Sequence, residues 1–198
     1  MNPVPVTLEG RFVRLEPLSY AFESDLVEAA EDHAIWEFLP FGPFDAAEEM
    51  HFWIAGSLKQ VDDGQRVWFA TVRRSDDRAV GATSYMDLRR EDRGLEIGGT
   101  WLTPTVWRTP INTEAKYLQL KHAFEELGCI RVQLKTDLRN IRSQRAIERL
   151  GAVKEGLLRK HMLVKNGLVR DTVMYSIIDT EWPLVKARLE RLLKRPSG

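Results

Sequence analysis

The clearest chemical signal in the sequence lies between Thr103 and Glu114, where a short apolar stretch gives way to a helical pattern. The backbone N–H groups of Ile111, Asn112 and Thr113 would lie in the first turn of that helix. They would have no acceptor within it, and the helix dipole would add partial positive charge. Arg108 stands just before them and could add a charge-assisted contact. The arrangement suits phosphate, although an ordinary strand-to-helix turn without a ligand is the other interpretation.

Four elements must position these groups. Residues 95–102 are short, apolar and rich in strand formers, and residues 129–136 alternate like a second strand. Helical spacing follows each of them, over 111–127 and 141–150, and a glycine ends each helix at Gly128 and Gly151. The sequence therefore predicts a strand–helix–strand–helix unit, in which the two strands lie side by side.

The remaining pattern predicts one α/β domain over residues 1–198, preceded by a flexible arm at 1–6. Ser19 is a candidate N-cap for a helix over 19–30, and Asp45 for a helix over 46–60. Three further strands are expected over 7–17, broken near Gly10, and over 66–73 and 79–88. A hairpin of strands 160–164 and 168–178 turns at Lys165, Asn166 and Gly167, and a final helix starts at Trp182. Early antiparallel strands followed by this unit give a mixed sheet with helices on both faces.

An aromatic, proline-rich loop occupies residues 36–44. Its aromatic side chains either cover an edge of the sheet or line a substrate cleft, since loops on a rigid scaffold often carry binding residues. The sequence does not decide between these two interpretations.

Composition describes a globular protein, with 43% hydrophobic residues in 198. Lys plus Arg equals Asp plus Glu, at 29 each, so no net field favours nucleic acid or an anionic membrane. No apolar run approaches the roughly 18 residues of a membrane span, and the N-terminus lacks the features of a signal peptide. The single cysteine, Cys129, suits a reducing cytosol and is expected to be a buried core residue.

Other catalytic classes lack their motifs. The four histidines have no metal-ligand spacing, so no metal is expected. Neither a Gly-x-Ser-x-Gly elbow nor a Walker sequence occurs, which argues against a serine hydrolase and a P-loop enzyme.

Four segments together resemble GNAT-superfamily N-acetyltransferases, specifically the RimJ/RimL-like branch: LEIGGTWL, WRTPINTEAK, KHAFEELGCIRVQLKTDLRN and NIRSQRAIERLGA. The last resembles the family's Asn-x-x-Ser-x-x-x-x-x-x-Leu-Gly segment through Asn140, Ser143, Leu150 and Gly151. The resemblance implies a GNAT-like α/β (α+β) fold. In that fold a mixed, largely antiparallel central sheet is flanked by helices, and the two strands beside the cofactor splay apart in a V.

One segment departs from the family pattern. The diphosphate loop of the family usually reads Gln/Arg-x-x-Gly-x-Gly/Ala, and the matching positions here are 107–112. Pro110 and Asn112 replace the two small residues, and Pro110 has no N–H to donate. We expect the amides of Ile111, Asn112 and Thr113 to remain available, with Arg108 as compensation. Weak or lost cofactor binding is the alternative.

The resemblance implies acetyl transfer from acetyl-CoA to a primary amine by direct attack in a ternary complex. Such a reaction needs a base for the amine and an acid for the departing thiolate. Glu96 is the candidate base, because burial in an apolar cleft would raise its pKa; the alternative is a surface glutamate paired with Arg89 or Arg93. Ser143 is the candidate acid, and the alternative is a hydroxyl that only caps the helix.

The implied acetyl-CoA site involves further residues. Asn140 contacts the pantetheine arm or orders its own turn, and Arg142 and Arg145 lie near the nucleotide end. Trp101, Leu102 and Thr103 offer backbone groups to the pantetheine, as though to another strand. The complete set of expected cofactor contacts is Trp101, Leu102, Thr103, Arg108, Thr109, Ile111, Asn112, Thr113, Asn140, Arg142 and Arg145.

We therefore expect a cytoplasmic acetyl-CoA-dependent N-acetyltransferase whose acceptor is a protein N-terminus or a small-molecule amine. A homodimer is compatible with the sequence. The competing class is a non-catalytic acyl-CoA-binding or interaction module that kept the fold while its diphosphate loop drifted, as Pro110 and Asn112 suggest.

Overall fold

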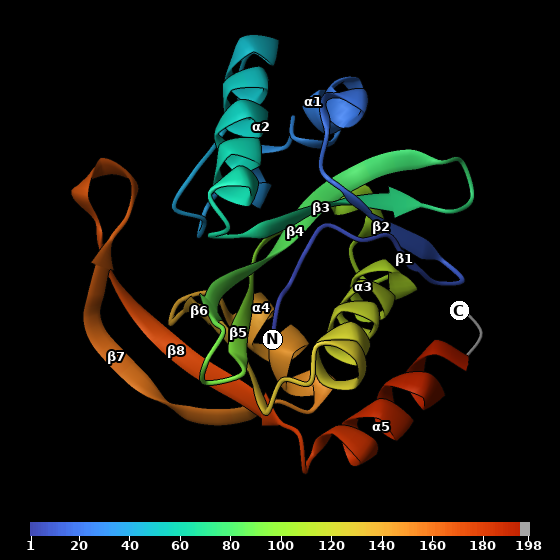
Figure 1. Ribbon diagram of the computed structural model, residues 1–198. Coiled ribbons are helices and arrows are strands. Elements are labelled where there is room, and N and C mark those ends of the chain that lie inside the picture. The colour runs from blue at the N-terminus through green and yellow to red at the C-terminus, as the bar shows by residue number, and fades with distance from the viewer. Residues whose placement is uncertain (195–198) are drawn as a thin grey trace.

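An eight-stranded sheet organises the molecule (Figure 1). The computed structural model describes residues 1–194, apart from the side chain of Asn166. The strands are β1 (Leu8–Glu9), β2 (Val13–Pro17), β3 (Val67–Arg73), β4 (Arg78–Arg89), β5 (Gly94–Leu102), β6 (Arg131–Asp137), β7 (Val153–Leu163) and β8 (Val169–Ile178). Their order in the sheet is β1-β2-β3-β4-β5-β6-β8-β7, and the pair β5–β6 is parallel while its neighbours are antiparallel.

Helices cover the sheet from both sides, as expected from the sequence. They are α1 (Glu23–Ala29), α2 (Ala47–Asp62), α3 (Pro110–Lys121), α4 (Ile141–Leu150) and α5 (Trp182–Lys194), with a π-helical turn at His122–Glu126 that continues α3. Helices α1 and α2 pack over the β2–β4 part of one face, whereas α3, α4 and α5 lie on the other face (Figure 1). The sheet thus separates two apolar cores.

Strands β5 and β6 pair over only three residues, from Gly94↔Arg131 to Glu96↔Gln133. Beyond that point β5 stays with β4 as far as Leu102, and β6 stays with β8 as far as Asp137. Gly99 adopts φ 62° at an irregularity in the β4–β5 register, a backbone conformation that favours glycine. The two strands therefore part in a V, as expected, and the opening lies beside the first turns of α3 and α4.

Local signals set the boundaries of the helices next to this opening. Helix α4 has the predicted range, because Asn140 Oδ1 accepts from the amide of Ser143 (2.9 Å) and Gly151 ends the helix at φ 108°. Gly128 follows α3 and its π-helical turn at φ 65°. Strand β6 begins two residues later than expected, because the amide of Cys129 still bonds to the carbonyl of Ala123.

Two predicted helix caps are wrong. Ala46, not Asp45, is the N-cap of α2, and Asp45 Oδ1 instead lies 2.8 Å from His33 Nε2. Ser19 precedes a short 3₁₀ turn at Tyr20–Phe22 without a capping bond from its side chain. Both errors arise because a cap is identified by contacts that the sequence pattern does not show.

Two segments are more structured than expected. Strand β7 begins at Val153, seven residues before the predicted hairpin strand, and a 3₁₀ turn at Lys165–Gly167 connects it to β8. The N-terminal segment forms no helix or strand, in agreement with an arm. However, Met1 and Val6 pack against the core and Pro3 is buried, so the contacts are not those of a free arm.

A buried carboxylate joins α3 to the N-terminal hairpin. Glu114 is 5% exposed, and it accepts hydrogen bonds from the backbone amides of Arg11 (2.9 Å), Phe12 (2.5 Å) and Val13 (2.8 Å). Gly10 leaves room for this carboxylate, since a Cβ there would lie 2.6 Å from Glu114 Cδ. The contact fixes the β1–β2 turn against the helix that opens the candidate site.

We predict that Glu114→Gln destabilises the protein by about 1–3 kcal/mol, because the amide NH₂ would face a backbone N–H and leave it without an acceptor. Urea unfolding would measure the difference. The exposed Glu126→Gln on the same segment is the matched control, with an expected change within about 0.5 kcal/mol. An equal effect of both substitutions would contradict this role for Glu114.

Candidate functional site

The start of α3 leaves backbone donors without partners. Thr109 is the N-cap, and its hydroxyl accepts from the amide of Ile111 at 3.4 Å, so that donor is partly satisfied by the chain. Pro110 occupies the first helical position, where its missing N–H costs little. Among residues 1–194, the amides of Asn112 and Thr113 donate neither to the carbonyl of Thr109 nor to a side chain. These two amides are therefore the donors that remain for an anion.

Arginines from two elements surround this helix start. The Arg142 guanidinium lies over the ring of Trp107, 3.6 Å from its centroid, and Arg149 Nη2 donates to Thr113 Oγ1 at 2.7 Å. Arg145 lies between them on the same face of α4 and is exposed. Arg108 is also exposed, and its backbone is left-handed at φ 64°. The structure thus brings the first turns of α3 and α4 together as a strongly basic site.

Part of the β5 backbone is already engaged within the chain. The carbonyl of Leu102 accepts from Trp107 Nε1 at 2.9 Å, and the amide of Thr103 donates to the carbonyl of Val80 at 2.9 Å. The side chain of Trp101 points to the α2 face, where its ring packs 5.1 Å from that of Trp36. A ligand beside this strand therefore meets fewer free groups at Leu102 and Thr103 than the sequence suggested.

Asn140 and Ser143 lie at the start of α4, beside the V. The Oδ1 atom of Asn140 caps the helix, which supports the interpretation in which this residue orders its own turn. Its NH₂ group and the Ser143 hydroxyl make no hydrogen bond to the residues that the structure describes. Both groups therefore remain available to a ligand.

Glu96 lies at the point where the two strands part, on the α2 face of the sheet. It is 2% exposed, and its Oε2 accepts from Lys135 Nζ at 3.1 Å and from Gln133 Nε2 at 3.2 Å. The alternative interpretation, a surface glutamate paired with Arg89 or Arg93, is therefore wrong. The Oε1 atom faces Gly98, because a Cβ on Gly98 would lie 2.9 Å from it. Among the described residues this oxygen has no donor, so it can accept from a substrate.

Two tyrosines that could have served as acids are engaged elsewhere. The hydroxyl of Tyr85 donates to the carbonyl of Gln119 at 2.6 Å, and burial raises the pKa of this residue well above its usual value. Tyr175 donates to Glu148 Oε1 at 3.0 Å, and burial raises its pKa to about 12. Cys129 is a buried core residue, as predicted, and burial raises its pKa to about 11.

A buried lysine of α3 contacts strand β5. Lys116 of α3 is 5% exposed, and its Nζ donates to Thr83 Oγ1 (2.8 Å), Thr100 Oγ1 (2.7 Å) and Gln119 Oε1 (2.9 Å). No carboxylate of residues 1–194 lies within ion-pair distance of it. Burial lowers the pKa of Lys116 to about 7. Thr100 connects this amine to the part of β5 that has left β6.

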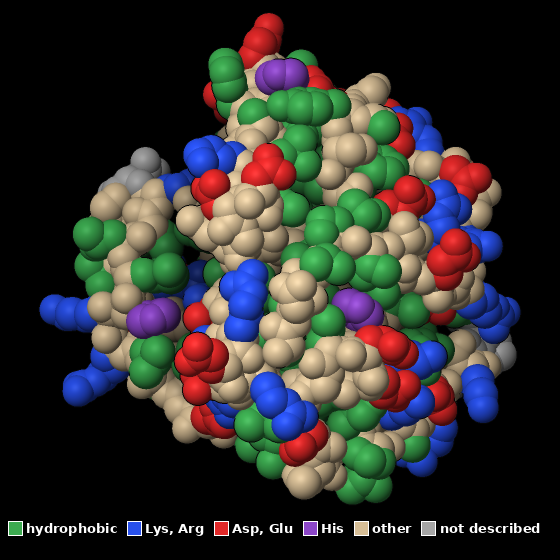
Figure 2. Space-filling view, in the orientation of Figure 1, with side chains coloured by type: hydrophobic (Ala, Val, Ile, Leu, Met, Phe, Trp, Pro, Cys, Tyr) green, Lys and Arg blue, Asp and Glu red, His purple; other side chains and the backbone are tan. Residues whose placement is uncertain are grey.

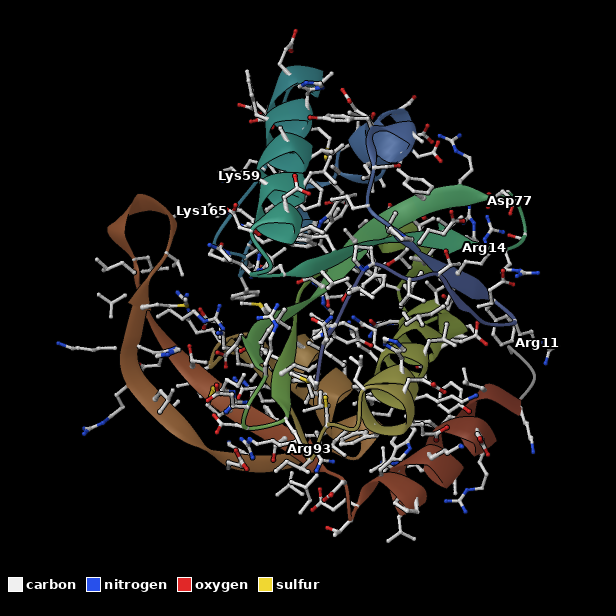
Figure 3. All side chains as sticks on the ribbon, viewed as in Figure 1. Arg11, Arg14, Lys59, Asp77, Arg93 and Lys165 are labelled. Carbon is white, nitrogen blue, oxygen red and sulfur yellow. The ribbon has the colours of Figure 1, made fainter. Side chains whose placement is uncertain are left out.

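The aromatic loop lies over the α2 face and touches the hairpin. Trp36 is buried among Phe44, Trp101 and Phe41, whereas Phe41, Phe44 and Trp53 are half-buried. Lys165 at the hairpin tip donates to the carbonyl of Trp36 at 2.7 Å, and Figure 3 labels this lysine between the hairpin and the segment before α2. The loop therefore covers the sheet on this face and contacts the hairpin.

Two surface hollows lie along the hairpin, and the second extends to the end of β6. One of about 820 Å³ is lined by residues 157–161 and Asp171, and one of about 230 Å³ by Asp137, Leu138, Arg139, Lys160, Val169 and Asp171. Both hollows are open, and neither is lined by residues from the starts of α3 and α4. The site is therefore located by the chemistry of its side chains and not by the size of a hollow.

Within residues 1–194, no group of three or more His, Cys, Asp or Glu side chains could hold a metal ion. None of the described helices has the length and apolar character to cross a membrane. Figure 2 shows acidic and basic side chains interspersed over the visible face, in agreement with the balanced composition.

Comparison with known proteins agrees with this geometry. Residues 13–153 match the family model of the acetyltransferase (GNAT) domain. A crystal structure from T. thermophilus, described as a "putative acetyltransferase", is 43% identical, with a TM-score of 0.88 over 98% of this chain and 100% of that one. A GCN5-related N-acetyltransferase from Brucella melitensis is 30% identical, with a TM-score of 0.92 over 99% and 88% of the two chains. Mycobacterium smegmatis RimJ, solved with CoA-disulfide, shares the fold at 22% identity, with a TM-score of 0.83 over 96% of each chain.

A mixed sheet with two parted parallel strands, and basic helix starts beside the opening, is the architecture of an acetyltransferase. The chain belongs to the GNAT acetyltransferase family.

Three polar residues of the site were not found from the sequence. Arg149 could have been found, because Arg142, Arg145 and Arg149 recur at helical spacing and so share one face of α4. No pattern in the sequence indicated Trp107, because its contacts with Leu102 and Arg142 depend on the folded arrangement. Lys116 lies within an apolar helical pattern, where a solvent-facing position was the simpler expectation.

We predict that Lys116 makes the stability of the protein rise with pH above about 7. The unfolded chain holds this proton up to about pH 10, so between these values it binds one proton more than the folded chain. The free energy of unfolding should then increase by up to about 1.4 kcal/mol per pH unit relative to Lys116→Met. Urea unfolding from pH 6 to 9 would measure this, with Lys121→Met as the exposed control. A constant difference across that range would show that Lys116 stays charged in the fold.

Proposed function

We propose that the protein transfers an acetyl group from acetyl-CoA to a primary amine, by direct attack within a ternary complex. The observation that carries the proposal is the pairing of unsatisfied amides at Asn112 and Thr113 with arginines from α4, beside a V-shaped opening between two strands. The acceptor is a peptide N-terminus or a small molecule, and the reaction belongs in the cytoplasm.

The residues fit acetyl-CoA by the chemistry of their donors. The amides of Asn112 and Thr113 would donate hydrogen bonds to the diphosphate oxygens, with Arg108, Arg142 and Arg145 as counter-charges. The amide-rich pantetheine would lie in the V, where Asn140 Nδ2 and the outer edge of β5 offer hydrogen-bonding groups. The RimJ structure with a CoA disulfide supports this assignment by analogy of fold.

Acetyl-CoA supplies an activated acyl carbon, and the chain supplies the proton transfers. Glu96 Oε1 would take a proton from the amine, directly or through water, as the new C–N bond forms. The Ser143 hydroxyl would donate a proton to the sulfur as the C–S bond breaks, and water would carry the proton from Glu96 back to the Ser143 oxygen. The products are an amide and CoA with a free thiol, so protons and bonds balance without an acyl-enzyme.

A non-catalytic acyl-CoA-binding module is the second candidate. Pro110 removes one amide from the helix start, and Thr109 partly engages that of Ile111. Binding of acetyl-CoA without turnover on any amine would favour this module, and an absence of binding would exclude both candidates.

Calorimetric titration with CoA tests the proposed binding site. Arg108→Ala should weaken binding by about 1–3 kcal/mol, the usual range for a charged hydrogen bond. Arg108→Gly should weaken it equally while stabilising the fold, because the left-handed backbone at φ 64° suits glycine. Arg93→Ala is a matched control, since Arg93 is also exposed and left-handed (φ 52°) but lies at the narrow end of the V. Unchanged affinity in both Arg108 variants would show that Arg108 points elsewhere.

Thiol release across a panel of amines tests the two proposed proton carriers. Glu96→Gln and Ser143→Ala should each lower turnover, by about 10²–10⁴-fold for loss of general acid–base catalysis, while CoA affinity stays within about twofold. The exposed Glu91→Gln is the control for Glu96. Turnover equal to that of the unaltered protein would remove the substituted residue from its proposed role.

A further inference from the structure

Arg170 of β8 is a buried cation that the proposed chemistry does not use. It is 5% exposed, and its Nε donates to Thr172 Oγ1 at 3.1 Å. No carboxylate of residues 1–194 lies within 4.0 Å of its guanidinium. Burial lowers the pKa of Arg170, with Asp137 and Glu96 opposing that shift. Burying a charge without a direct partner is costly, so the position requires an explanation.

The carboxylates near Arg170 already have cations of their own. Glu96 pairs with Lys135 at 3.1 Å, and Asp137 pairs with Arg139 at 2.6 Å. Glu37 and Asp171 also act on Arg139, and Asp87 accepts from Gln133 Nε2, so these carboxylates likewise face groups other than Arg170. Arg66 is a further cation, and its Nη2 lies 2.8 Å from Met86 Sδ rather than beside an acid. Among residues 1–194, neither Arg66 nor Arg170 forms an ion pair.

These groups share one face of the sheet. Cross-strand pairs place Glu96 beside Gln133, and Asp137 beside Thr172, and Arg170 follows two residues along β8 on the side of Thr172. This is the face of α1 and α2, opposite the basic helix starts of α3 and α4. An acceptor could therefore reach Glu96 from the side opposite acetyl-CoA.

The aromatic loop and the hairpin border this face. The ring of Phe38 lies 5.9 Å from the Arg139 guanidinium, and Lys165 bonds to the carbonyl of Trp36. Figure 2 shows the surface hollowed between the β7–β8 hairpin and the rest of the molecule.

We infer that the acceptor amine carries a carboxylate, which Arg170 binds while the amine lies at Glu96. This inference rests on the proposed function. A guanidinium fork matches a carboxylate with two hydrogen bonds, and the incoming anion would give Arg170 the ion pair that residues 1–194 do not supply. Arg170 and Glu96 come from different strands, with β6 between them, so several bonds separate the amine from the carboxylate. The carboxylate can belong to a free amino acid or to an acidic residue of a peptide.

Matched acceptor pairs test the inference. We would measure KM and kcat for ω-amino acids of increasing length and for their neutral amides, and for peptides with Glu or Gln at the second position. The carboxylate member should have a KM about 10–100-fold lower, as expected for a charged hydrogen bond. Preference among amino acids or peptides would identify the source of the carboxylate.

Variants of Arg170 should remove this preference. Arg170→Gln should raise KM for the carboxylate members by about 10–100-fold and leave that for the neutral amides unchanged. Arg170→Lys keeps the charge without the planar guanidinium. Its KM for the carboxylate members should lie between those of the unaltered protein and Arg170→Gln, and this variant replaces Arg170→Gln if that protein does not fold. The exposed Arg159→Gln on the same hairpin is the control and should change neither value.

The outcomes separate this inference from the proposed function. Equal KM for carboxylates and amides in the unaltered protein would overturn the inference and leave acetyl transfer in place. If no amine is acetylated, equilibrium dialysis of 6-aminohexanoate against the protein–CoA complex decides. Binding that is lost in Arg170→Gln would support a carboxylate site, whereas no binding, or equal binding in both proteins, would overturn it.

Discussion

The early separation of β5 from β6 is the constraint on which the rest of the site depends. Each strand keeps its other partner, β4 or β8, so the sheet stays continuous on both sides of the opening. Unpaired backbone groups inside a protein need other partners. Trp107 supplies one by bonding to the carbonyl of Leu102, and the remaining edge groups face the space between the two strands. A ligand rich in amides would complete what the sheet leaves open.

The sheet also divides the chemistry between its two faces. On one face, the first turns of α3 and α4 gather unsatisfied amides and arginines, and Lys116 stands behind β5. On the other face, Glu96 lies among paired and unpaired cations beneath an aromatic loop. The V is where the two faces of the sheet communicate. In the proposed reaction, the thioester would approach from one face and the amine from the other.

Local signals in the sequence predicted much of the fold, and long-range contacts limited the rest. The range of α4 was predicted because Asn140 and Gly151 act within the helix itself. The start of β7 was missed because nearly all of its side chains are at least partly exposed, which removes the alternation that identifies a strand. Glu114 bonds to amides about one hundred residues away in the sequence. Arg170 has no ion pair because the nearby carboxylates, Glu96 and Asp137, pair with Lys135 and Arg139. The family segments predicted the cofactor contacts, which stay a prediction, and they gave no information about the acceptor side.

A crystal structure of the protein with CoA would show whether the first turn of α3 and the V hold the cofactor. We expect diphosphate oxygens within about 2.7–3.2 Å of the amides of Asn112 and Thr113, and a pantetheine chain between β5 and β6. A structure in which the Pro110 ring or the Asn112 side chain fills that position, with CoA bound elsewhere or absent, would contradict this expectation.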